Sequence, residues 1–205
     1  GVYSFCMCPG GYVVNASSEQ GLLAVNGMSY QARDGENANS ALIVTVTPED
    51  FPEEGALGGI AFQRDLEKKA WELGKGKVPV QLFGDFCAHQ PSSQLGEIHP
   101  NIKGGYVLTD VRSILPKELG DSIEEGIFAF GKKLSDFDRK DAVLSGIESR
   151  TSSPVRLVRD QKGLSNITGI YPCGEGAGYA GGITSAAMDG IKTAEWIASE
   201  YMMKL

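Results

Sequence analysis

The feature that most constrains this chain is a glycine-rich stretch near its end, YPCGEGAGYAGGITSAAMDG at 171–190. The residues that lead into the first glycine, 167–173, are rich in β-branched and aromatic side chains, which predicts a short buried strand. After it, apolar residues recur at helical spacing, which predicts a helix that begins at Gly182 or Ile183 and ends near Tyr201. The stretch is therefore expected to be a strand, a glycine-rich turn and a helix N-terminus.

Such a turn has a chemical use. The first N–H groups of a helix lack partners within the helix, and the helix dipole is positive at that end, so a nearby anion is stabilised. Gly181 and Gly182 would allow the closest approach, and the carboxylate of Glu175 can accept hydrogen bonds from hydroxyls of a sugar or sugar-alcohol chain. The alternative is that the glycines only form a tight turn and a close helix contact.

Composition and charge argue against several classes of function. The chain has 205 residues and a formal net charge of −7, so no basic stripe is available for nucleic-acid phosphates or an anionic membrane surface. No apolar run reaches the roughly 18 residues needed to cross a bilayer, and the N-terminus lacks the pattern of a signal peptide. We expect a cytoplasmic protein without a nucleic-acid or membrane partner.

The four cysteines are too few for a disulfide scaffold in a chain of this length, so reduced thiols are expected. Cys6 and Cys8 form a C-x-C pair that can be a redox dithiol or half of a metal site, with Cys87 and His89 as the other half. The alternative places Cys6 and Cys8 as two small buried side chains of a strand. We favour the strand and expect no metal.

Local patterns along the chain predict a mixed α and β fold with a largely antiparallel or mixed sheet and several helices. Runs of strand-forming residues separated by Pro-Gly-Gly predict that the first two strands pair antiparallel. The predicted elements are strands at 2–7, 12–17 and 41–47, a helix at 60–74, a strand at 78–86, a long loop at 87–105, helices at 116–137 (capped by Asp121 or Ser122) and 138–150, and a hairpin of strands at 154–160 and 167–173.

Two motifs carry a family resemblance. The closing CGEGAGYAGGITSAAMDGIKTA at 173–194 resembles the C-terminal FAD signature of the glutathione-reductase-like flavoproteins, in which the last helix begins beside the flavin. FCMCPGGYVVNASSEQG at 5–21 and GMSYQARDGENANSALIV at 27–44 resemble more narrowly the bacterial FAD-dependent dehydrogenases related to BaiN-type flavoproteins. The resemblance spans nearly the whole chain and implies an FAD-dependent oxidoreductase that acts on a small molecule.

The resemblance also implies roles for residues of the turn at 174–183. Following Gly174, Glu175 would accept hydrogen bonds from the ribityl hydroxyls of FAD. Gly181, Gly182 and Ile183 would present backbone N–H groups to the pyrophosphate or to the pyrimidine edge of the flavin, where negative charge develops on reduction.

Asn37 and Asn39, in the run RDGENANS, are candidates for the flavin or substrate face. They lie in a polar segment, 27–41, that either touches a ligand or is a solvated connection. No residue is assigned as the catalytic acid or base.

One part of the superfamily pattern has no counterpart in this chain. A G-x-G-x-x-G strand–turn–helix unit binds the ADP half of FAD, and the nearest glycine cluster here, GALGGI at 55–60, lacks a preceding apolar strand. With an abrupt start at Gly1, this predicts a C-terminal fragment: a substrate-type domain at 1–150 and a return, 151–205, into a Rossmann-like FAD domain. The dinucleotide-binding half would then lie upstream in the same polypeptide.

We expect this part alone to bind FAD weakly or not at all, and to be inactive, because the ADP half supplies many of the contacts. A different class of function stays open from the sequence, namely a non-catalytic module. In that case the segments 27–41 and 87–105 form a partner-binding surface and the glycine-rich turn is only structural.

Overall fold

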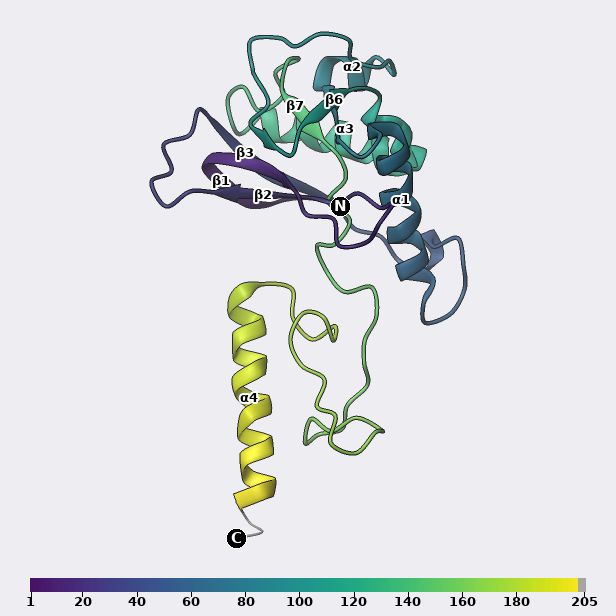
Figure 1. Ribbon diagram of the computed structural model, residues 1–205, viewed down its shortest axis with the longest axis vertical. Helices are drawn as coiled ribbons and strands as arrows, with labels where there is room; N and C mark the ends of the chain where they lie inside the picture. The colour runs from purple at the N-terminus through teal and green to yellow at the C-terminus, as the bar shows by residue number, and fades with distance from the viewer. Residues whose placement is uncertain (203–205) are drawn as a thin grey trace. The chain divides into compact units, whose positions relative to one another are not determined.

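The structure is a computed structural model that describes residues 1–202 (Figure 1). The chain divides into two compact units. The first comprises Gly1–Asp50 and Gln63–Ser149, and the second comprises Phe51–Phe62 and Arg150–Leu205.

The first unit begins with one long strand, β1 (Val2–Asn15). The prediction of two short strands that pair antiparallel around Pro-Gly-Gly is therefore wrong. The pairing of β1 with β3 (Asn37–Val44) shifts register between Phe5 and Cys8 and again between Cys8 and Gly11. These β-bulges bend the strand without reversing it.

Gly10, in the Pro-Gly-Gly tripeptide, allows β1 to bend at this point. Its φ is +58°, a conformation that favours glycine, and a Cβ at this position would lie 2.2 Å from the carbonyl of Arg33. The glycine therefore permits a left-handed backbone and a close approach of the following loop, and the strand continues through it.

The sheet around β1 has the order β2-β1-β3. β2 (Val25–Ser29) and β3 are antiparallel to β1, and β5 (Ile102–Lys103) runs parallel to it. β2 and β3 occupy much of the segment 27–41, because pairing with β1 orders residues whose own pattern is polar.

A second sheet of the same unit has the order β6-β4-β7. β4 (Val78–Leu82) is parallel to β6 (Tyr106–Leu108) and antiparallel to β7 (Val143–Ser145). Together with the helices, these sheets confirm the predicted mixed α and β class.

The helices agree with the predictions in part. α1 (Gly58–Gly74) and α3 (Lys117–Gly131) correspond to the helices predicted at 60–74 and 116–137, although α3 is shorter. Pro116 is the N-cap of α3, so the predicted caps are wrong and Asp121 lies inside the helix. The short α2 (Phe83–Cys87) replaces the end of the strand predicted at 78–86, and two 3₁₀ turns complete the unit, η1 (Pro48–Asp50) and η2 (Val111–Ile114).

The helix predicted at 138–150 does not form, because part of this segment is strand β7. Leu144 pairs with Gln81 and Val143 with Leu82, so the edge of β4 is hydrogen-bonded. Backbone pairing with a distant strand outweighs the local helical pattern.

The core of the first unit lies among the two sheets and the helices. α3 contacts both β1 and β3, and a Cβ on Gly126 would lie 2.6 Å from the side chain of Val2. Gly126 therefore allows α3 to approach the sheet closely at Val2. The fully buried side chains include Leu23, Val78, Val80, Phe83, Phe86, Ile114 and Ile127.

The second unit ends in a long helix, α4 (Ile183–Met202), as predicted. The strands predicted at 154–160 and 167–173 are not formed, and these residues have an irregular backbone with short turns only at places. A strand needs a neighbour that accepts its backbone hydrogen bonds, and within residues 1–202 this unit contains no other strand. Val158, which lies within the strand predicted at 154–160, is 79% exposed.

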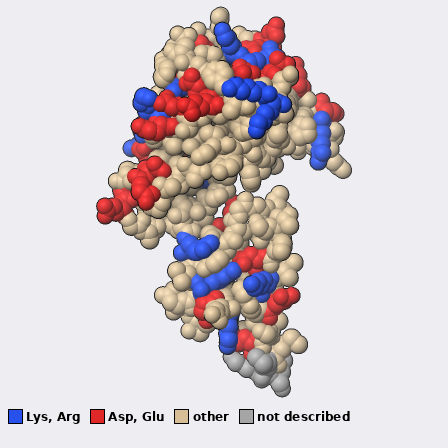
Figure 2. All heavy atoms as spheres, turned by 180° about the vertical axis from the view of Figure 1, so that it is seen from behind, with Lys and Arg blue, Asp and Glu red and all other residues tan. Residues whose placement is uncertain are grey.

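Charge is distributed over the surface without large separation on the face drawn in Figure 2, where lysine and arginine side chains lie among aspartate and glutamate side chains. None of the helices within residues 1–202 is both long enough and apolar enough to span a membrane.

Candidate functional site

A carboxylate from α4 holds the start of the glycine-rich turn. Asp189 accepts two hydrogen bonds from the guanidinium of Arg159, at 2.9 and 2.6 Å, and a third from the backbone N–H of Gly174 at 2.9 Å. Arg159 also donates to the carbonyl of Pro172 at 2.8 Å. The turn is therefore anchored to the helix that follows it.

This anchor changes the acid–base properties of Asp189. Hydrogen bonds from Arg159, and then from the N–H of Gly174, lower the pKa of Asp189 to about 2. The Arg159 guanidinium also lies 3.6 Å from the ring centroid of Tyr179, whose hydroxyl accepts a hydrogen bond from the backbone N–H of Arg159. The positive charge of Arg159 is thus balanced by Asp189 of α4 and is not offered to a ligand.

The end of the turn forms the N-terminus of α4. The N–H of Gly182 donates to the hydroxyl of Ser185 at 3.1 Å, and its carbonyl accepts from the N–H of Ala186 at 2.9 Å. Ser185 therefore satisfies one of the orphan donors of the helix terminus. Ile183, the first residue of the helix, is 93% exposed.

The five predicted flavin contacts fall on this turn and helix start. Gly174 has a φ of +72°, and no heavy atom lies within 4 Å of where its Cβ would be. At Gly181 the nearest such atom is 4.0 Å away. Glu175 is exposed, and its carboxylate makes no hydrogen bond to residues 1–202.

These residues fit the ribityl and phosphate groups of FAD. There is room for a close neighbour at Gly174 and Gly181, and Glu175 has a carboxylate free to accept hydrogen bonds from hydroxyls. The N–H groups of Gly174 and Gly182, however, already donate to Asp189 and Ser185. The strand that was expected to lead into Gly174 is absent, so the start of the turn is positioned by Asp189 and Arg159 instead. No local sequence pattern indicated this pair, whose members lie 30 positions apart in the chain.

A cavity of about 490 Å³ lies in the first unit. Its walls come from β1, β2, β3, α3, β7 and the segment 98–102, and its size is in the usual range for small-molecule sites. Most of the lining is apolar, including Phe86, Val111, Leu115, Ile123, Ile127, Phe137 and Leu144.

Asn37 and Asn39 both line this cavity. Their amide nitrogens are used by the protein: Asn37 Nδ2 donates to the carbonyl of His99 at 2.7 Å, and Asn39 Nδ2 donates to the carbonyls of Tyr12 and Met28 at 3.3 and 3.5 Å. Both side chains therefore link β3 to neighbouring segments of the first unit. A ligand could contact only those amide atoms that these hydrogen bonds leave free.

Glu148 also lines the cavity, and sequence reasoning missed it because it lay within the helix predicted at 138–150. Its side chain is half-buried, and burial raises the pKa of its carboxyl above the ordinary value.

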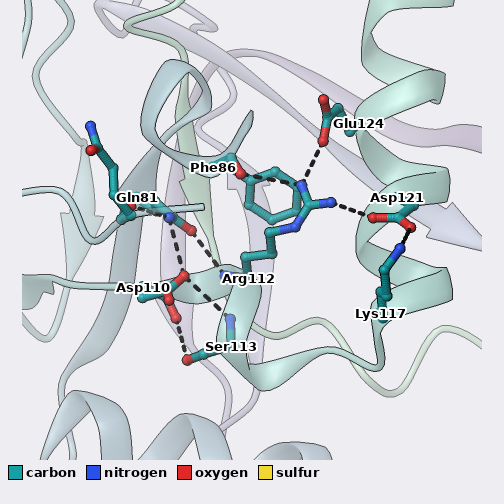
Figure 3. A network of polar contacts seen from close by, with 9 residues as sticks. Gln81, Phe86, Asp110, Arg112, Ser113, Lys117, Asp121 and Glu124 are labelled. Carbon is teal, nitrogen blue, oxygen red and sulfur yellow. Dashed lines mark hydrogen bonds and ion pairs between the residues drawn. The ribbon is translucent and has the colours of Figure 1, made fainter. Parts of the chain in front are cut away.

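A network of polar contacts surrounds Arg112, next to the cavity wall (Figure 3). The guanidinium donates to Glu124 at 2.6 Å, to Asp121 at 2.5 Å and to the carbonyl of Phe86 at 3.2 Å. The backbone N–H of Arg112 donates to Gln81 Oε1 at 2.9 Å. The donors of Arg112 are directed to protein groups, which indicates a structural role.

The residues of the alternative metal site do not come together. Within residues 1–202 no three side chains of the metal-binding types form a cluster. Cys6 is exposed and has a φ of +46°, so the expectation that both C-x-C side chains are buried is wrong for it. Burial raises the pKa of Cys8, and burial together with Glu124 raises the pKa of Cys87 to about 11, which disfavours the reactive thiolate.

Comparison with known proteins decides the family. A family described as "FAD-dependent protein, C-terminal domain-like" matches residues 1–151. The chain belongs to this family. The description of this family indicates part of a flavoprotein. The matched residues include those that line the cavity of the first unit, and the match ends before the glycine-rich turn.

A relative of this FAD-dependent C-terminal domain is a protein of Clostridium beijerinckii described as "Uncharacterized protein". The two are 54% identical over 204 residues, which is 98% of this chain and 38% of the relative. The chain therefore spans less than two fifths of the length of this relative.

Proposed function

We propose that this chain is the C-terminal part of a cytoplasmic FAD-dependent oxidoreductase, a dehydrogenase related to the BaiN-type flavoproteins. The observation that carries the proposal is the family match over residues 1–151. In this proposal an upstream dinucleotide-binding half of the same polypeptide holds the ADP portion of FAD, and the cavity of the first unit takes the small-molecule substrate.

The bound flavin would supply hydride or electron transfer. The residues of this chain would bind and orient it: Glu175 would accept hydrogen bonds from the ribityl hydroxyls, and Gly181 and Ile183 would present backbone N–H groups. The N–H groups of Gly174 and Gly182 already donate to Asp189 and Ser185, so these two glycines would contribute only the room for a close approach. Asp189 would keep the turn in place, since it holds the N–H of Gly174. This division of roles is supported by the exposure of Glu175, Gly181 and Ile183 and by the carboxylate of Glu175 having no hydrogen bond within residues 1–202.

The surface of the second unit supports an upstream partner segment. Several large apolar side chains of its turns and of α4 are exposed, a pattern that marks an interaction surface. They include Leu157, Val158, Ile167, Ile170, Ile183, Met188 and Ile191. In the proposal, the segments 154–160 and 167–173 become strands of a Rossmann-like domain when the upstream half provides neighbouring strands.

The test compares FAD binding by the longer polypeptide and by this chain alone. We expect the longer protein to purify with flavin absorbance and this chain to bind FAD weakly or not at all. In the longer protein, Glu175→Ala should lower FAD affinity about tenfold, since it removes hydrogen bonds to a charged group. Glu195→Ala, a change to an exposed residue of α4, serves as the matched control.

Stoichiometric FAD on the isolated chain would contradict the need for an upstream half. A longer protein without flavin, or one whose FAD affinity is unchanged by Glu175→Ala, would contradict the proposed roles. The partner-binding module would then be the better interpretation.

A further inference from the structure

Glu148 occupies a fixed place in the wall of the cavity. The residue before it, Ile147, accepts a hydrogen bond at its carbonyl from the N–H of Val25 at 2.9 Å. The residue after it, Ser149, accepts one at its carbonyl from Gln63 Nε2 at 2.8 Å. The backbone on both sides is therefore held, and Glu148 is presented from a defined position.

The carboxyl of Glu148 has no compensating partner. It is half-buried, and it makes no hydrogen bond or ion pair with residues 1–202. Desolvation is the cause of its raised pKa, so the ionised form lacks a nearby cation. An uncompensated carboxyl beside apolar walls is costly unless a ligand supplies the missing charge.

The other charged residues of the cavity wall do not supply that charge. Arg139 lines the cavity, but its guanidinium donates to Asp141 at 2.5 and 2.9 Å and to Glu97 at 3.0 Å, so its charge is already balanced. Glu36 is a second, exposed carboxylate in the lining. Within the described lining, the uncompensated charge is therefore negative.

We propose that this cavity binds an amine, a molecule with an apolar body and one positively charged nitrogen that contacts Glu148. The inference rests on the proposed function in that it names the substrate class of the same cavity. The apolar walls bury the body of the ligand, and the ammonium gives Glu148 the partner that the protein does not. An anionic ligand is disfavoured because it would face two carboxylates without a free cation.

The experiment uses three probes of similar size: 2-phenylethylamine, 2-phenylethanol and phenylacetate. Their binding to the full chain is measured by calorimetry at mildly alkaline pH, without FAD. We expect the amine to bind about tenfold more tightly than the alcohol, the usual scale for a charge-assisted hydrogen bond, and phenylacetate to bind most weakly.

Glu148→Gln should remove the preference for the amine and leave binding of the alcohol unchanged, which also shows that the variant is folded. Glu36→Gln, the matched change at the exposed carboxylate, should alter amine affinity less than about twofold because solvent screens it. An amine that binds no better than the alcohol to the unaltered chain, or a preference that survives Glu148→Gln, would overturn the proposal.

Because these titrations contain no flavin, their result is separate from that of FAD binding. Amine binding with no flavin in the longer protein would overturn the oxidoreductase and leave an amine site. Flavin in the longer protein without amine preference here would overturn the amine site and leave the oxidoreductase.

Discussion

Asn39 lies across β1 and β2 in space that two glycines leave free. A Cβ on Gly27 would lie 2.2 Å from Asn39 Oδ1, and a Cβ on Gly11 would lie 2.4 Å from Asn39 Nδ2. The amide connects three strands through the carbonyls of Tyr12 and Met28. At the scale of single residues, then, the polar run around Asn39 has a packing role that its sequence did not indicate.

Gly27→Ala should destabilise the first unit by about 1–3 kcal/mol, because the new methyl group meets the Asn39 amide. In the background of Asn39→Ala the same change should cost less, since the obstacle is gone. Gly11→Ala is the control: its Cβ would also lie 2.7 Å from the carbonyls of Cys8 and Met28, so it should be costly in both backgrounds. Urea unfolding measures these free energies, and equal costs of Gly27→Ala in both backgrounds would contradict the argument.

The helices and strands of the first unit are joined by buried polar groups at their ends. Arg112 of η2 bonds α2 through the carbonyl of Phe86 and α3 through Asp121 and Glu124. At the scale of elements, α3 was predictable from its apolar spacing. Its attachment to η2 was not, because the partners lie 9 and 12 residues apart on different elements.

Arg112→Met should cost about 3 kcal/mol of unfolding free energy, since it leaves two carboxylates without their buried partner. Lys117→Met removes a contact to the same Asp121, but the Lys117 side chain is 77% exposed, against 9% for Arg112. Its cost should therefore be much smaller than that of Arg112→Met, because solvent screens the exposed pair. Denaturant unfolding of both variants tests the contrast, and similar losses would refute it.

In the second unit, α4 is joined to the glycine-rich turn by Asp189. Its pKa is lowered from 3.8 to about 2 in the folded chain, so its contribution to stability is present above pH 3.8 and is lost as the pH falls through about 2. Asp189→Asn should lower the melting temperature at neutral pH, and the difference from the unaltered chain should shrink between pH 3.8 and 2. Glu195→Gln is the exposed control, and a pH-independent difference for Asp189→Asn would exclude this linkage.

At the scale of the whole molecule, the two units differ in how much apolar surface they cover. The first unit buries large aromatic and aliphatic side chains, whereas the second exposes many of them along its turns and α4. A division near residue 150 was expected from the sequence. The assignment of Phe51–Phe62 to the second unit was not, since it depends on contacts between segments far apart in the chain.

Ile191→Asp tests the apolar surface of α4. The side chain is 63% exposed, so in this chain the change should alter stability by less than about 0.5 kcal/mol. In the longer polypeptide, where we propose that this surface is covered, it should lower the melting temperature and the retained FAD. Thermal unfolding and flavin absorbance measure the two effects, and an equally silent change in the longer protein would argue against a covered surface.

The sequence by itself determined those structural features that depend on residues close together in the chain. The helical spacing of α1, α3 and α4 and the turn of glycines before Ile183 follow from local periodicity and backbone freedom. The motifs within 5–44 indicated the FAD-dependent family that matches residues 1–151. Only the tertiary structure decided that β1 continues through Pro-Gly-Gly, that 143–145 pair with β4, and that 154–160 and 167–173 form no strands. It also decided that Glu148 faces a cavity and that Asp189 holds Gly174. The physical reason is that strand pairing, burial and ion pairs take their energy from residues distant in the chain, which no local pattern specifies.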